Sequence, residues 1–327
     1  MNNKGYFIVS LDFELMWGVH DVTTLDKYSQ RLSSTRKAIP KLLDLFDKYS
    51  IHATWATVGM LFAENKKQIL DNIPERDLLP SYDNIMHSSY KYLNQVGNSE
   101  KEDPYHFASS LIEEIRKHDF QEVASHTYSH YYCNEEGQTQ DQFRKDLEIN
   151  RAMVKDDDIV SIVFPRNQCN PNYLSTCKEK GFLAYRGMEN TYINRYDFPE
   201  KVKRLLRFLD SYINISGNHC YSLSDAFEDS TKMLNLKSSC FFRPYVSKRK
   251  FLERFKIRRV KKQMLYAARH NKIFHMWWHP HNMGENTAEF FDELEEIFRF
   301  ATELNRLYGF QSANMRDIVK TINCEDK

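Results

Sequence analysis

The stretch Ser125-His126-Thr127-Tyr128-Ser129-His130 carries the residues best suited to bind a metal ion. On a helical turn, two histidines four residues apart lie on one face, so His126 and His130 can bind one cation through neutral imidazole nitrogens. The alternative is two unrelated histidines, one capping and one packing, because His-x3-His is a short pattern. Residues 121–124 read as a short strand, which puts the pair at a strand end, a common position for catalytic groups.

A pair of carboxylates follows the apolar run 6–11, which predicts a strand. Asp12 and Glu14 are two residues apart, so on a strand they point to the same side while Phe13 points to the other. Such a pair can divide its work, with one carboxylate binding a cation and the other handling a proton. The alternative is a pair of solvated surface acids, but their neighbours, Leu11, Phe13, Leu15, Met16 and Trp17, are too apolar for an ordinary exposed loop.

Polar residues also end three later apolar runs. Arg166 follows residues 159–164, Arg243 follows residues 238–242, and His279 and His281 follow residues 272–278. In a barrel of alternating strands and helices, the C-terminal ends of the strands meet around one cleft. This regular placement favours a metal-dependent hydrolase over scattered surface polar groups.

The elements that must position these residues alternate in type along the chain. Strands are predicted at 6–11, 52–58, 121–124, 159–164, 182–185, 238–242, 272–278 and 310–313, and helices at 33–49, 60–67, 106–118, 139–155, 171–180, 200–212, 248–270, 286–308 and 314–322. Strands joined through helices by short connections indicate parallel βαβ units and an α/β fold. Residues 69 to about 105 do not continue this alternation of strands and helices, and we interpret them as an insertion over one rim of the domain.

Composition excludes several classes of protein. The chain has 327 residues and a net charge of +1, so no overall field favours nucleic acid or a membrane surface. No apolar stretch approaches the roughly 20 residues of a membrane span, and no secretion signal is visible. The six cysteines form no Cys-x-x-Cys pair, so we expect free thiols in the cytoplasm. The basic stretch 248–270 could bind an anionic ligand, but a solvated helix face is the favoured interpretation.

Four motifs together resemble the polysaccharide deacetylases, and they occur in the order found in that family. They are Ser10-Leu11-Asp12-Phe13-Glu14, Ser125-His126-Thr127-Tyr128-Ser129-His130, Phe164-Pro165-Arg166-Asn167-Gln168 and Trp278-His279-Pro280-His281-Asn282. The resemblance implies a metal-dependent amide hydrolase on a distorted (β/α)7 barrel, with residues 1–327 as one catalytic domain. The spaced acidic pair and the Pro-Arg-Asn-Gln form depart from secreted members. They look closer to the cytoplasmic allantoinase-like and peptidoglycan-deacetylase-like branch.

The resemblance also implies a role for each motif residue. Glu14, His126 and His130 would hold a divalent metal, zinc in first place, although which of the two acids binds the metal stays open. Asp12 would be the general base, kept ionised by Arg166, and His279 the acid that protonates the leaving nitrogen. Contacts to the substrate are expected from Trp17, Tyr128, Arg243, His281 and Asn282.

The expected reaction is removal of an acyl group, acetyl in first place, from an N-acylated sugar or glycan precursor that is free, nucleotide-linked or lipid-linked. One alternative is a hydrolase of cyclic amides or ureides. Another is a metal-binding protein without turnover, which a complete set of base, metal site and acid argues against. A homo-oligomer is left open.

Overall fold

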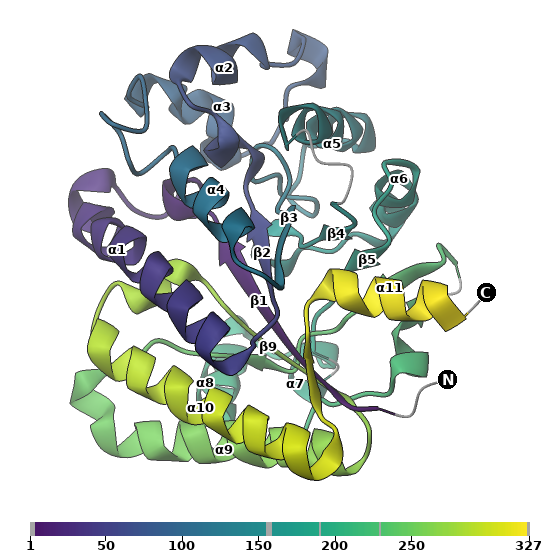
Figure 1. The fold of residues 1–327 in the computed structure, drawn as a ribbon. Coiled ribbons are helices and arrows are strands. Elements are labelled where there is room, and N and C mark those ends of the chain that lie inside the picture. The colour runs from purple at the N-terminus through teal and green to yellow at the C-terminus, as the bar shows by residue number, and fades with distance from the viewer. Residues whose placement is uncertain (1–3, 155–158, 190, 229, 326–327) are drawn as a thin grey trace.

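A computed structural model describes residues 4–154, 159–189, 191–228 and 230–325. Figure 1 shows a curled sheet surrounded by helices. The strands are β1 (Tyr6–Phe13), β2 (Ala53–Thr57), β3 (Gln121–Ser125), β4 (Ser161–Ile162), β5 (Ala184–Tyr185), β6 (Phe227–Glu228), β7 (Met233–Asn235), β8 (Cys240–Phe241), β9 (Ile273–Trp278) and β10 (Gln311–Ala313). Their order is β6-β7-β5-β4-β3-β2-β1-β9-β8, with β10 also paired to β1. All of these pairs are parallel except β6 with β7. The predicted fold class, a distorted barrel of strands and helices in one domain, is confirmed.

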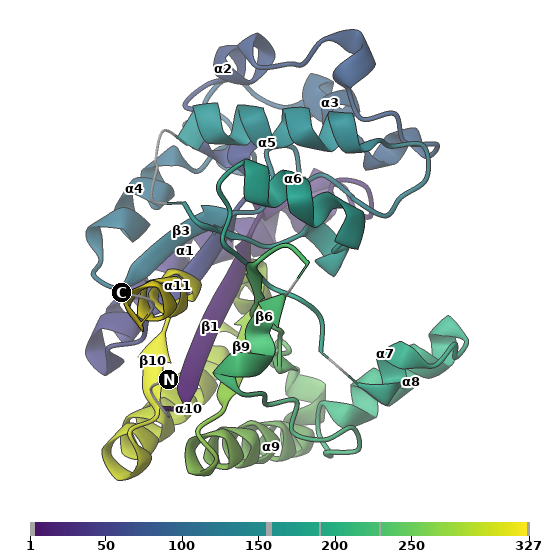
Figure 2. The ribbon, with the colours of Figure 1, turned by 90° about the vertical axis from the view of Figure 1, so that its right-hand side faces the viewer.

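Helices separate most of the strands along the chain, except β6, β7 and β8, which follow one another directly. They are α1 (Leu25–Tyr49), α2 (Lys66–Asp71), α3 (Ser89–Tyr92), α4 (Ser109–Lys117), α5 (Gln140–Val154), α6 (Leu174–Glu179), α7 (Tyr192–Arg195), α8 (Glu200–Asp210), α9 (Lys250–Arg269), α10 (Thr287–Tyr308) and α11 (Met315–Glu325). Helices α1, α10 and α9 pack side by side along the sheet, whereas α7 and α8 extend from the body near α9 (Figures 1 and 2). In the described part of the chain, no helix is both long and apolar enough to cross a membrane.

Strand β1 separates two cores. Its odd-numbered residues from Phe7 to Phe13 belong to the main core, which includes α1, α9 and α10. Tyr6 and Ile8 belong to a smaller core on the concave side, together with residues of α11. Because side chains alternate along a strand, Asp12 continues the row of Tyr6 and Ile8 into the concave side of the sheet.

The observed elements match most of the predicted ones, with a few corrections. Helix α1 begins at Leu25 instead of residue 33, and the single helix predicted at 60–67 is a 3-10 turn, η2 (Gly59–Phe62), followed by α2. Strands β6 and β7 were not predicted, because two or three residues are too few to show a period.

The segment from 69 to 105 packs against the loop that follows β3. Ser89 Oγ donates to the carbonyl oxygen of Ser129 at 2.7 Å, and the Tyr82 hydroxyl accepts from the N–H of Tyr132 at 2.8 Å. The segment therefore supports the loop that carries His126 and His130.

Candidate active site

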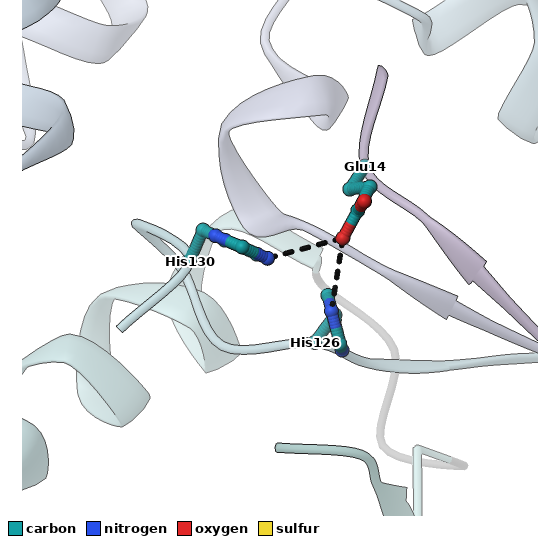
Figure 3. Close-up of side chains that lie close together, drawn as sticks. All are labelled: Glu14, His126 and His130. Carbon is teal, nitrogen blue, oxygen red and sulfur yellow. Dashed lines mark hydrogen bonds and ion pairs between the residues drawn. The ribbon is translucent and has the colours of Figure 1, made fainter. Parts of the chain in front are cut away.

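Glu14, His126 and His130 converge on one point beyond the ends of β1 and β3 (Figure 3). Glu14 Oε2 lies 3.4 Å from His126 Nε2 and 3.1 Å from His130 Nε2. All three residues are buried, and their ligand atoms lie within 4.8 Å of one another. Among the described residues, no other group of three histidine, cysteine or acidic side chains meets this criterion. The acids and histidines predicted from separate strand ends are therefore brought together.

The hydrogen bond made by one ring nitrogen of His126 leaves the other ring nitrogen available to bind a cation. Its Nδ1 lies 2.8 Å from the carbonyl oxygen of Val163, which can only accept, so Nδ1 carries the proton. Its other ring nitrogen, Nε2, faces the Glu14 carboxylate at 3.4 Å. A cation between the two groups, either a metal ion or a proton on Nε2, would satisfy both in this buried site. A backbone carbonyl that fixes the second ring nitrogen is also typical of metal-binding histidines.

Burial sets the protonation states of the cluster. It lowers the pKa of His130 to about 4, against the opposing effect of Glu14. Burial alone would raise the pKa of Glu14, but His279 and the hydrogen bonds from His126 and His130 lower it well below its usual value. A neutral imidazole beside an ionised carboxylate is the state in which both groups bind a metal.

The two histidines do not lie on the predicted helical turn. The chain leaves β3 in a loop in which Thr127 and His130 have positive φ angles of 62° and 57°. Asp146 on α5 holds this loop by accepting from the N–H groups of Tyr128 and Ser129 at 2.7 and 3.0 Å. In this loop the ring centroids of the two imidazoles lie 5.1 Å apart, although the backbone is not helical.

Asp12 is paired with Arg186, and the predicted pairing with Arg166 is wrong. Arg186 directly follows β5, and its two terminal nitrogens donate to the two Asp12 oxygens at 2.7 and 2.8 Å. Both side chains are buried. Burial alone would raise the pKa of Asp12, but the charge and hydrogen bonds of Arg186, together with the charges of His126 and His279, lower it below its usual value.

Arg166 lies in a 3-10 turn, η6 (Pro165–Asn167), with a positive φ of 54°, and its side chain turns away from Asp12. It forms an ion pair with Asp21 and covers the ring of Tyr132 at 4.2 Å. The sequence did contain a signal for Arg186, because this residue follows the predicted strand 182–185 just as the other candidates follow theirs. That signal was overlooked.

A buried hydrogen-bond chain extends from the Arg186–Asp12 pair. Arg186 donates to Ser10 Oγ at 3.0 Å, and Ser10 Oγ lies 2.8 Å from His275 Nε2. His275 Nδ1 donates to the carbonyl oxygen of Leu236 at 2.9 Å, so Nε2 accepts from Ser10 and the ring is neutral. Burial, followed by the charge of Arg186, lowers the pKa of His275 to about 3.

The buried, neutral state of His275 predicts a pH-dependent contribution to the free energy of unfolding. An unfolded histidine binds a proton near pH 6.5, whereas folded His275 stays neutral down to about pH 3. The stabilisation it provides is therefore complete above pH 6.5 and declines as the pH falls below that value. The loss of unfolding free energy in His275→Gln, measured by urea denaturation in chelator, should shrink by about 2 kcal/mol between pH 7.5 and pH 5. His270→Gln makes the same replacement at an exposed site and serves as the matched control.

His279 and His281 reach the same centre from the end of β9. His279 Nε2 lies 3.7 Å from Asp12 Oδ2 and 3.6 Å from Glu14 Oε1. His281 Nδ1 lies 3.8 Å from Glu14 Oε1, and its ring stacks on His279 with centroids 4.8 Å apart. The His279 side chain is 24% exposed and that of His281 only 9%, so His279 offers more surface to a ligand.

The residues expected to contact the substrate lie in different environments, some fully buried and others near the site. Trp17 and Tyr128 are fully buried, and Trp17 donates to the carbonyl oxygen of His106 at 2.9 Å. They pack beneath the site, so their predicted contact with substrate is wrong. Asn282 Oδ1 accepts from the N–H of His279 at 3.2 Å, which supports that histidine. Arg243 lines a cavity beside the centre.

Sequence comparison connects this geometry to one family. A family model described as "Polysaccharide deacetylase" matches residues 22–185, half of the chain. The matched region includes His126 and His130, whereas Asp12, Glu14, Arg186 and His279 lie outside it. No curated protein matches the sequence.

Solved structures with similar folds have little sequence identity to this chain. A protein from Mycobacterium smegmatis assigned to the polysaccharide deacetylases is 13% identical with a TM-score of 0.59, covering 100% of this chain and 93% of that one. One from Pseudomonas aeruginosa with the same assignment is 13% identical with a TM-score of 0.54, covering 96% and 89%. A 4-alpha-glucanotransferase from Thermococcus litoralis is 10% identical with a TM-score of 0.53, covering 97% and 38%. These likenesses support the barrel fold alone.

Proposed function

Because the chain belongs to the polysaccharide deacetylase family, we propose that it is a metal-dependent hydrolase that releases acetate from an N-acetylated sugar or glycan precursor. The observation that carries this proposal is the buried cluster in which His126 Nε2 and His130 Nε2 both face the Glu14 carboxylate, at 3.4 and 3.1 Å. Beside it, Asp12 and His279 supply a second carboxylate and a second imidazole for proton transfer.

In this proposal Glu14, His126 and His130 hold one divalent cation. Mixed nitrogen and oxygen ligands suit zinc, and three protein ligands leave a position open, as in catalytic sites. When bound, the cation supplies Lewis acidity, which polarises the acyl carbonyl and makes water a nucleophile near neutral pH.

The protein's own groups would then move the protons. Asp12, held ionised and oriented by Arg186, accepts a proton from the water that attacks the acyl carbon. His279 gives a proton to the sugar nitrogen as the carbon–nitrogen bond breaks. The products are acetate and the free amino sugar, so one water is consumed for each bond cleaved.

Acetate release from a panel of N-acetylated and O-acetylated sugars tests the proposal. The zinc-loaded protein should release acetate from at least one N-acetyl sugar, chelator should stop the reaction, and zinc should restore it. His126→Ala should stay folded but purify nearly free of metal by plasma emission, because loss of a ligand removes much of the affinity. His270→Ala, which changes an exposed histidine at the end of α9, should keep both metal and activity.

Release that persists in chelator, or full metal occupancy in His126→Ala, would refute the metal assignment. Release from O-acetyl sugars alone would refute the amide assignment.

A further inference from the structure

A cavity of about 290 Å³ lies next to the acid–base pair, and the chemistry described above does not use it. Asn167 and Trp277 form part of its wall, and both touch Arg186. Asn167 Oδ1 accepts from Arg186 at 2.9 Å, and the Trp277 ring lies 4.1 Å from the Arg186 guanidinium carbon. Since Arg186 binds Asp12, a ligand in this cavity would be connected to the proposed general base through a wall residue and Arg186.

Three arginines line the cavity. They are Arg166, Arg207 and Arg243. Arg243 is held by Ser211 Oγ at its Nε and by the carbonyl oxygen of Arg207 at 3.4 Å. Within the described residues, no carboxylate lies within ion-pair distance of Arg243. Burial lowers the pKa of Arg243, and the charges of Arg249 and Arg207 act in the same direction. This guanidinium is therefore partly desolvated and lies near other positive charges.

One of the two acids in the cavity wall is already bound to groups outside the cavity. The two acids are Glu189 and Asp210. Asp210 binds Arg259, which lies outside the wall, and also accepts from two backbone N–H groups. On the other side, Arg166 is paired with Asp21. Arg243 therefore presents a guanidinium to the cavity that no carboxylate of the described residues pairs with.

We propose that this cavity binds a phosphate ester carried by the acylated sugar, an inference that rests on the proposed function above. Guanidinium groups bind phosphate oxygens through forked, charge-assisted hydrogen bonds. Three arginines also suit a phosphate better than a single carboxylate, because the phosphate carries more negative charge. The substrate class is then a sugar phosphate, either free or as the linkage to a nucleotide or lipid, in preference to a neutral glycan.

Calorimetry on the zinc-loaded protein tests this inference with two probes, N-acetylglucosamine 1-phosphate and N-acetylglucosamine. The phosphate should bind about tenfold more tightly, in line with one or more hydrogen bonds between charged groups. Arg243→Gln should remove this preference without changing the affinity for the neutral sugar, and Arg243→Lys should keep part of it. Arg254→Gln, which removes an exposed arginine of α9 outside this cavity, should bind like the original protein. Thermal melting should show that each variant is folded.

Equal affinity for the two probes, no measurable binding of the phosphate, or a preference that survives in Arg243→Gln would overturn the inference. A tighter complex with N-acetylmuramic acid than with the sugar phosphate would overturn it in favour of a carboxylate. A polyprenyl-phosphate-linked N-acetyl sugar in detergent micelles distinguishes a lipid source from a soluble one, and preferential binding of either supports the phosphate. Because binding needs no turnover, a phosphate preference without acetate release would refute the proposed function alone.

Discussion

Asp12→Asn should keep its metal and lose turnover by about two to four orders of magnitude, the usual range for removing a general base. An amide oxygen can still accept one hydrogen bond from Arg186, but it cannot take a proton from water. Because Arg186 is buried, its loss of a charged partner should also lower the free energy of unfolding. Activity and metal content should therefore be measured well below the melting temperature of the variant.

Glu14→Gln is the matched comparison, because it makes the same chemical change two residues along the chain. This variant should lose metal as well as turnover, since Glu14 is the carboxylate nearest to His126 and His130. If Asp12→Asn loses metal and Glu14→Gln keeps it, the two roles are reversed. Loss of metal in both variants would indicate that the two acids share the ion.

His279→Ala should reduce kcat by about two to four orders of magnitude and keep the metal, as expected for removal of a general acid. The acid must carry its proton before the carbon–nitrogen bond breaks, so the rate should fall at alkaline pH in the original protein. That alkaline limb should disappear in His279→Ala.

His281→Ala is the internal control for this assignment. His281 is more deeply buried than His279, and burial lowers its pKa to about 3, so we expect it to be neutral at working pH and His279 to be the proton donor. Its replacement should affect kcat less and leave the alkaline limb in place. If His281→Ala removes the limb and His279→Ala does not, the acid is His281.

The sequence predicted those site residues whose direction follows from the two-residue alternation of side chains along a strand and from their position at a strand end. The apolar run at 6–11 fixed which face of β1 carries Asp12, because side chains alternate regardless of what packs around them. Parallel strands then brought their C-terminal ends together, so Glu14 and His126 meet although 112 positions separate them in the sequence. The local sequence pattern was therefore sufficient to place a side chain wherever the strand alone determines which way that side chain points.

The predictions were wrong where contacts between distant parts of the chain set the direction of a side chain or the conformation of a loop. Arg166 and Arg186 both follow short strands, but Arg166 has a positive φ and pairs with Asp21, whereas Arg186 pairs with Asp12. The loop of His126 and His130 is held by Asp146, which lies on a different element and gives no local signal. Trp17 was expected at a binding surface, but its burial depends on the segment from 69 to 105, which packs over it through Tyr92.

Anomalous diffraction at the zinc edge, from crystals grown with zinc, would locate the bound ion. We expect a peak about 2.0–2.2 Å from a Glu14 oxygen, His126 Nε2 and His130 Nε2, the distances usual for zinc with these ligands. No peak at this position under saturating zinc, or a peak that lacks either histidine as a ligand, would contradict the proposed metal site.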